Sequence, residues 1–143
     1  MNITSTQNPL IKKIALLSEK SRERKKQGLC VVEGAREIRL ALQGGYTLDN
    51  LLYQSDIFSE KQLTELLGYT AQKVTPIAIS KEVYEKISYR SSTEGVIALV
   101  QVKKHGLDTL VFKNKKPLLL VAEAPEKPGN IGALLRTADA AHI

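Results

Sequence analysis

The feature that most constrains the fold is an alternation of short apolar runs with segments of helical periodicity over the first hundred residues. The apolar runs have the length of strands, and they are LCVVE (29–33), LDNLLYQ (48–54), KVTPIAI (73–79) and GVIALVQV (95–102). Helical patterns lie between them, and two of these patterns open on a serine N-cap, Ser59 or Ser80. This order predicts a small α/β sandwich around a central, mostly parallel sheet.

A helix is expected before the first strand, over residues 8–26. Asn8 is a suitable N-cap, and Pro9 suits the first helical position because its missing N–H costs nothing there. Apolar residues recur at helical spacing up to Leu17, whereas SEKSRERKKQG (18–28) contains none. The second half of this helix is therefore expected to extend into solvent, where a partner can reach it, and to end at Gly28.

Positive charge is concentrated in the same segment. The chain carries a net charge of +6, and residues 12–26 alone contribute +5 through seven basic and two acidic residues. The basic residues are Lys12, Lys13, Lys20, Arg22, Arg24, Lys25 and Lys26. Such a cluster suits the phosphate backbone of RNA or DNA, or another anionic surface. The alternative is a solvated helix face with no ligand.

Other features narrow the class of protein. The single cysteine, Cys30, excludes an internal disulfide, and its place in a strand indicates a core residue. His105 and His142 have no neighbouring ligand residues, so no metal site is expected. No apolar run approaches the length of a membrane-spanning helix, and the N-terminus lacks the apolar core of a signal peptide. A cytoplasmic protein is predicted.

The pattern changes after residue 102. Residues 103–116 are rich in lysine and read as an interdomain linker with one helical turn at 107–112. Residues 117–122 predict a new strand, and residues 130–141 predict the helix after it. A strand as apolar as LLLVA (118–122) needs cover on both faces and a neighbour at each edge, which one helix cannot supply. The chain is thus expected to be a fragment that ends just inside a second domain.

The stretch PGNIGALLRTADAAHI (128–143) follows that strand and opens the helix, the position where open parallel sheets bind ligands. Gly129 and Gly132 allow close approach of the backbone, and a helix N-terminus favours an anion such as phosphate. Neither the Walker pattern nor G-x-G-x-x-G is present. Asn130 and Arg136 can share a ligand only if Asn130 lies in the loop before the helix. Arg136 paired with a surface carboxylate is the alternative.

Several segments together resemble a known family. NIGALLRTADA (130–140) is similar to the first motif of the SpoU (TrmH-like) RNA ribose 2′-O-methyltransferases of the SPOUT class. NPLIKKI, VVEGAREI and STEGVIALV are similar to the L30e-like substrate-binding domain that precedes the catalytic domain in many of these enzymes. The resemblance implies an L30e-like domain at 1–102, a linker at 103–116, and the start of a knotted methyltransferase domain at 117–143.

The resemblance also implies an activity. The family transfers a methyl group from S-adenosylmethionine to a ribose 2′-hydroxyl of ribosomal or transfer RNA, and its catalytic domain forms a homodimer. Asn130 and Arg136 match the motif residues that handle the target ribose and its phosphate. Residues that form the S-adenosylmethionine pocket are expected beyond Ile143, so the chain alone is predicted to be inactive. The family commonly has Asp-Gly-like residues where this chain has Glu123-Ala124, which leaves the RNA target open.

Some residues are predicted to contact RNA from the charge of the sequence, and others from the resemblance to the family. Glu33 and Gly34 match the family's E-G after the first strand, and Arg36 follows them closely, on the side of the small domain expected to face RNA. YRSST (89–93) offers Arg90, hydroxyls and a ring for stacking, although a plain loop has the same composition. The predicted set is Lys12, Lys13, Arg22, Arg24, Lys25, Lys26, Glu33, Gly34, Arg36 and Arg90.

Two alternatives to an enzyme remain open at this point. The L30e-like fold is shared with RNA-binding proteins that catalyse nothing, and the chain could be such a non-catalytic module. A protein-interaction domain whose basic helix meets an acidic partner is the other. For the enzyme, Arg136 is better suited to hold a phosphate and stabilise a developing alkoxide than to act as a base, since a guanidinium keeps its proton above about pH 12.

Overall fold

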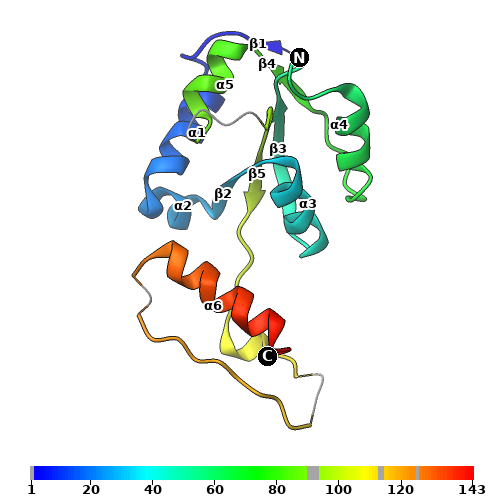
Figure 1. Ribbon diagram of the computed structural model, residues 1–143. Helices are drawn as coiled ribbons and strands as arrows, with labels where there is room; N and C mark the ends of the chain where they lie inside the picture. Colours follow the sequence, from blue (N-terminus) through cyan, green and yellow to red (C-terminus); the bar gives the residue numbers. More distant parts are fainter. Residues whose placement is uncertain (1, 90–93, 113–114, 125) are drawn as a thin grey trace. The chain divides into compact units, whose positions relative to one another are not determined.

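The computed structural model describes residues 2–89, 94–112, 115–124 and 126–143 (Figure 1). The chain divides into two compact units, Met1–Lys104 and His105–Ile143. Each unit is described by itself below. None of the helices in the described ranges has both the length and the apolar content that crossing a bilayer requires.

The first unit is built on a five-stranded sheet with the order β1-β4-β3-β5-β2. The strands are β1 (Asn2–Ile3), β2 (Leu29–Glu33), β3 (Thr47–Tyr53), β4 (Ile77–Ile79) and β5 (Val96–Gln101). β4 is parallel to both β1 and β3, whereas β5 is antiparallel to both β2 and β3. Four strands therefore point one way and β5 alone points the other, which confirms the prediction of a mostly parallel sheet.

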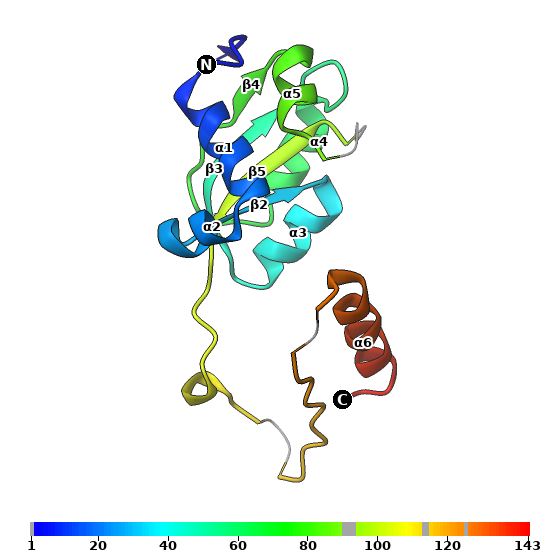
Figure 2. The ribbon, with the colours of Figure 1, turned by 90° about the vertical axis from the view of Figure 1, so that its left-hand side faces the viewer.

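Helices cover both faces of this sheet. They are α1 (Pro9–Glu19), α2 (Ser21–Gln27), α3 (Ala35–Gln43), α4 (Glu60–Leu67) and α5 (Lys81–Ile87). α1 and α5 lie on one face, and α3 and α4 lie on the other (Figures 1 and 2). β5 supplies both cores, because Ile97 and Leu99 pack with the first pair of helices while Val96, Ala98 and Val100 pack with the second.

The local signals for helix starts are confirmed. Asn8 caps α1 through its side-chain oxygen, which accepts a hydrogen bond from the Leu10 N–H at 2.9 Å. Ser59 and Gln62 form a reciprocal capping box at α4, and Ser80 caps α5. Each cap satisfies an N–H group that the helix itself leaves unpaired, which is why these short patterns predict the boundaries well.

The prediction of one helix over residues 8–26 is wrong. The backbone leaves helical geometry at Lys20, with φ −109° and ψ 105°, and α2 begins at Ser21. Arg24 Nη1 donates to the carbonyl oxygens of Leu17 at 2.7 Å and Ser18 at 3.1 Å. An uninterrupted helix would pair these carbonyls with N–H groups one turn later. The guanidinium replaces those partners, and Gly28 ends α2 with a φ of +63°.

The second unit differs from its prediction in one respect. Its described elements are η1 (Leu107–Thr109) and α6 (Pro128–Ala140), and no strand forms at residues 117–122. The run LLLVA has strand composition, but a strand exists only when a neighbour completes its backbone hydrogen bonds. None of the described strands pairs with this segment, and the apolar side chains of residues 118–121 are exposed.

Candidate nucleic-acid interface

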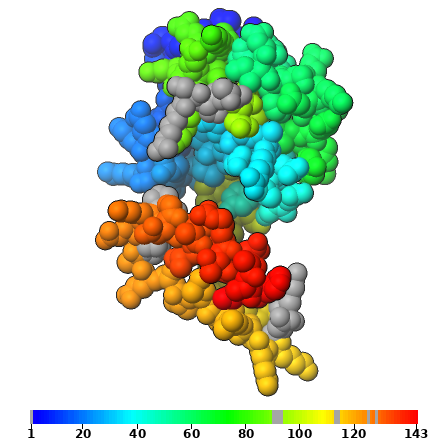
Figure 3. Space-filling view, viewed as in Figure 1, coloured from blue at the N-terminus to red at the C-terminus, as the bar shows by residue number. Residues whose placement is uncertain are grey.

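The second helix presents a positive face. Arg22, Lys25 and Lys26 are exposed, and their spacing of three and four residues brings them to one side of α2. Neither of the two ion pairs found among the described residues involves α2. Figure 3 shows this segment in blue at the left of the molecule. We name Arg22, Lys25 and Lys26 the α2 cation face; it is suited to consecutive phosphates of a nucleic-acid strand.

The two predicted lysines of α1 lie in different surroundings. Lys12 lines a cavity of about 360 Å³ together with Lys20 of the interhelix break and Lys86 of α5. Lys13 instead places its Nζ 3.8 Å from Asp49 Oδ2, at the start of β3. The lining also includes Glu19, so Lys12 belongs to a groove with three basic residues and one acidic one that extends toward α5, whereas part of the Lys13 charge is balanced. Lys86 was not among the residues predicted from the sequence, because α5 is distant from α1 along the chain.

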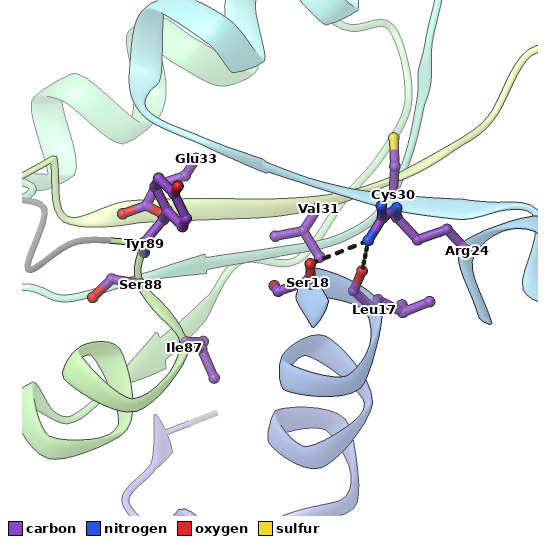
Figure 4. Close-up of a pocket in the computed structure, with 9 residues that line it drawn as sticks. All are labelled: Leu17, Ser18, Arg24, Cys30, Val31, Glu33, Ile87, Ser88 and Tyr89. Carbon is purple, nitrogen blue, oxygen red and sulfur yellow. Dashed lines mark hydrogen bonds between the residues drawn. The ribbon is translucent and has the colours of Figure 1, made fainter. Parts of the chain in front are cut away.

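Arg24 is partly buried rather than part of the exposed face. Its Nη1 is held by the two α1 carbonyls, and its guanidinium lines a cavity of about 320 Å³ against β2 (Figure 4). Burial raises the pKa of the nearby Cys30 thiol above its ordinary value, and the positive charge of Arg24 lowers it by a smaller amount. Cys30 packs against the core shared with α3 and α4, as its strand position predicts.

Glu33 is the centre of a hydrogen-bonded junction. Its Oε2 accepts from the Tyr89 backbone N–H at 2.7 Å, and its Oε1 accepts from the Tyr84 hydroxyl at 3.3 Å. The Tyr84 oxygen in turn accepts from the Gly95 N–H at 2.9 Å. This cluster ties β2 to α5 and to the start of β5. Tyr84 was missed from the sequence, since nothing local connects it with a residue 51 positions away.

Gly34 makes the turn from β2 into α3, and Arg36 lies in the first turn of that helix. Gly34 is buried with a φ of +97°, so it makes a corner that other residues rarely adopt.

Arg36 is exposed and lines a second cavity of about 320 Å³ with Arg39 and Tyr69. The Arg39 guanidinium lies 5.8 Å from the centroid of the Tyr69 ring, a cation–π distance. Arg39 and Tyr69 were not predicted as site residues. Arg90 lies outside the described residues.

The two residues predicted to be catalytic both lie on α6. Asn130 is in the first turn of the helix rather than in the loop before it, and its N–H donates to the Lys127 carbonyl at 3.0 Å. Six helical residues place Arg136 about 9 Å further along the axis and about 120° around it, so the sequence-based condition for a shared ligand is not met and the two residues can act on one ligand only if the long Arg136 side chain reaches back along the helix. A Cβ at Gly132 would lie 3.4 Å from Arg136 Nη1. The Arg136 guanidinium therefore lies back over the preceding turn, toward the helix N-terminus.

The described side chains of the second unit are exposed from residue 105 onward, apart from partial burial at Gly132 and Ala138. No group of three or more His, Cys, Asp or Glu residues that could hold a metal ion occurs in the described ranges.

Comparisons with known proteins give these features a family context. Residues 8–98 match the MRM3-like substrate binding domain. A tRNA/rRNA methyltransferase of Synechocystis sp. is 31% identical over 145 residues, an alignment that covers 99% of this chain and 50% of that protein. A crystal structure of an RNA 2′-O ribose methyltransferase is similar with a TM-score of 0.77 and 38% identity, over 99% of this chain and 52% of the other.

A second solved structure agrees with this result. The SpoU methyltransferase AviRb from Streptomyces viridochromogenes, solved with AdoMet, has a TM-score of 0.71 and 26% identity over 94% of this chain and 50% of its own. The chain spans about half the length of the relatives it matches. On the match over residues 8–98, the chain belongs to the MRM3-like substrate-binding domain family, whose relatives here are SpoU/TrmH-type RNA methyltransferases.

Proposed function

We propose that this chain supplies the RNA-binding part of an RNA ribose 2′-O-methyltransferase that acts on ribosomal or transfer RNA. The observation that carries the proposal is the match of residues 8–98 to a substrate-binding domain. The relatives are named as methyltransferases of these RNAs, which supports the substrate class. A cytoplasmic location and a homodimer of the complete enzyme are part of the same proposal.

The α2 cation face is the proposed electrostatic contact with RNA. Its three cations are exposed on one side of a short helix, and the groove at Lys12 and Lys86 extends the positive surface along α1. Each phosphate that a cation neutralises releases condensed counterions, so affinity must fall steeply with salt. These contacts hold and orient the RNA without reading its sequence.

The test reverses the charge of Arg22, Lys25 and Lys26 together, each to Glu. RNA affinity at 100 mM salt is expected to fall by at least about tenfold. The magnitude of the slope of log affinity against log salt is expected to decrease by about two to three, because about three phosphate contacts are lost. Fluorescence anisotropy with a labelled ribosomal RNA fragment measures both. The matched control replaces Lys61, Lys73 and Lys104 with Glu, which changes the net charge equally at exposed positions outside α2.

Equal losses in the two triple variants would show that net charge alone governs binding, and the assignment of the α2 cation face would be wrong. RNA affinity unaffected by the α2 variant would favour an acidic protein partner instead. A complete protein with RNA affinity but no methyl transfer would favour the non-catalytic L30e-like module. These outcomes separate the proposed function from both alternatives.

Arg136 is proposed to act by electrostatics and Asn130 to help position the target ribose. S-adenosylmethionine supplies the methyl group when bound. The Arg136 guanidinium lies back over Gly132, toward the end of α6 that attracts anions. There it would hold the phosphate beside the target ribose and stabilise negative charge on the 2′-oxygen.

This role has a kinetic signature in an enzyme that contains the whole chain. Arg136→Ala is expected to lower kcat/KM by about 10²–10³, the loss typical of removing one preorganised donor to a developing oxyanion. The pH–rate profile of the unmodified enzyme should show no ionisation that depends on Arg136. An ionisation near neutral pH that disappears in Arg136→Ala would assign the residue as a base instead.

A further inference from the structure

The cavity between α1, the end of α5 and β2 has an architecture that the basic surface alone does not explain. It has a volume of about 320 Å³, and its walls combine apolar side chains with an arginine at one end and a carboxylate at the other (Figure 4). Leu17, Val31 and Ile87 provide the apolar part. If the cavity served only to attract anions, a carboxylate would not be expected among its lining residues.

The arginine end is preorganised. Arg24 Nη1 is fixed by the carbonyls of Leu17 and Ser18 at 2.7 Å and 3.1 Å. Within the described residues, the Nε–H and Nη2–H groups of Arg24 make no hydrogen bond and no ion pair. This outer edge of a guanidinium is the one that binds two phosphate oxygens in parallel. Because the other nitrogen is already held, little side-chain freedom is lost when a phosphate binds.

The carboxylate end offers acceptors. Each Glu33 oxygen accepts one hydrogen bond, from Tyr84 or from the Tyr89 backbone, and a carboxylate has about four acceptor positions. Beside it, the Ser88 hydroxyl is buried and has no hydrogen-bond partner. A buried hydroxyl without a partner destabilises a fold, so its presence at a cavity wall needs a reason. Tyr89, 69% exposed, adds an aromatic ring to the lining.

The two ends differ in what they can bind. Arg24 offers N–H donors to an anion at one end of the cavity, and Glu33 offers acceptors to the edge of a base at the other. Among the bases, guanine carries the adjacent N1–H and N2–H donors that match two carboxylate oxygens, whereas the edge of uracil presents a single N–H between two carbonyls.

We propose that this cavity binds one unstacked guanine nucleotide of the substrate RNA, with its phosphate on Arg24 and its base edge on Glu33, and that the buried Ser88 hydroxyl rotates to meet the base when it binds. The inference rests on the proposed function and deepens it, because it gives the domain a means of reading sequence in single-stranded RNA. The α2 cation face supplies affinity for any RNA, and the cavity supplies preference for a guanine.

The experiment compares labelled pentamers UUGUU, UUAUU, UUCUU and UUUUU by fluorescence anisotropy with the whole chain. UUGUU is expected to bind at least about fivefold more tightly than the other three pentamers. Ser88→Ala removes a hydroxyl that makes no bond in the protein, so it should fold at least as stably and yet weaken the guanine preference. Glu33→Gln should abolish the preference, with folding verified by thermal denaturation. The α2 triple variant should weaken all four RNAs equally.

Each outcome has a separate meaning. Equal, salt-sensitive binding of all four pentamers overturns the guanine site and leaves the proposed function intact. A preference that survives both Ser88→Ala and Glu33→Gln also overturns it. No binding of any RNA at low salt contradicts the proposed function itself. If guanosine 5′-monophosphate competes as strongly as UUGUU, the cavity serves a free nucleotide and not RNA.

Discussion

Gly95→Ala is expected to lower the free energy of unfolding by about 2–5 kcal/mol. Gly95 is buried just before β5 with a φ of +71°, where an L-residue costs about 1–2 kcal/mol. A Cβ there would lie 2.8 Å from two atoms of Ile57 and 3.1 Å from Phe58 Cβ, and such overpacking costs about 1–3 kcal/mol more. The backbone at Gly95 also bonds to Tyr84 and Gln54, so it cannot shift without breaking those contacts.

The matched control is Gly28→Ala. Gly28 also has a positive φ, +63°, but its added Cβ would meet no atom within 4 Å. The loss at this position is therefore expected to be limited to backbone strain, about 1 kcal/mol. Urea denaturation followed by circular dichroism measures both variants. Equal losses at the two glycines would show that the space around Gly95 does not matter and would contradict the packing described there.

Ile97→Ala is expected to destabilise the first unit by about 2–5 kcal/mol, a large part of the stability of a domain of this size. Ile97 is fully buried on β5, the strand that pairs with both β2 and β3. Removing its outer methyl groups leaves a cavity between the sheet and the α1–α5 layer, and a sheet bonded on both sides of the strand cannot collapse to fill it. The same denaturation experiment gives the value.

Leu40→Ala is the control for this variant. Leu40 is a large apolar residue of the same unit, but it lies on α3 with 51% of its surface exposed. Its loss is expected to change stability by no more than about 0.5 kcal/mol. A comparable cost at Leu40 and Ile97 would mean that Leu40 is covered in solution, which would identify a contact surface on α3.

The elements of the first unit could be predicted because their signals are local. The capping serines, Asn8 with Pro9, and the apolar run of β5 each act within a few residues, through hydrogen bonds or burial that the neighbouring sequence specifies. The mostly parallel arrangement of the strands also followed from the order of elements, since helical crossovers favour parallel strands. The strand β1 escaped prediction because its two residues are too few to show a pattern.

The candidate site was predicted only in part. The cations of α2 could be identified from charge alone, because a helix without apolar residues must be exposed on most of its sides. Arg24 looks the same in the sequence, yet it turns back to hold the end of α1 and line a cavity. Nothing in the local sequence distinguishes it from Lys25 beside it.

The amino-acid sequence by itself thus determined the helices, the main strands of the first unit and the concentration of charge near the N-terminus. The tertiary structure decided the break at Lys20, the junction of Glu33 with Tyr84 and Gly95, and the cavity beside them. It also decided that residues 117–122 form no strand. The junction and the cavity depend on partners distant along the chain, and a strand at 117–122 depends on a neighbour that this segment cannot supply. The break at Lys20 depends on the contact of Arg24 with the carbonyls of Leu17 and Ser18, which the periodicity of the sequence does not show.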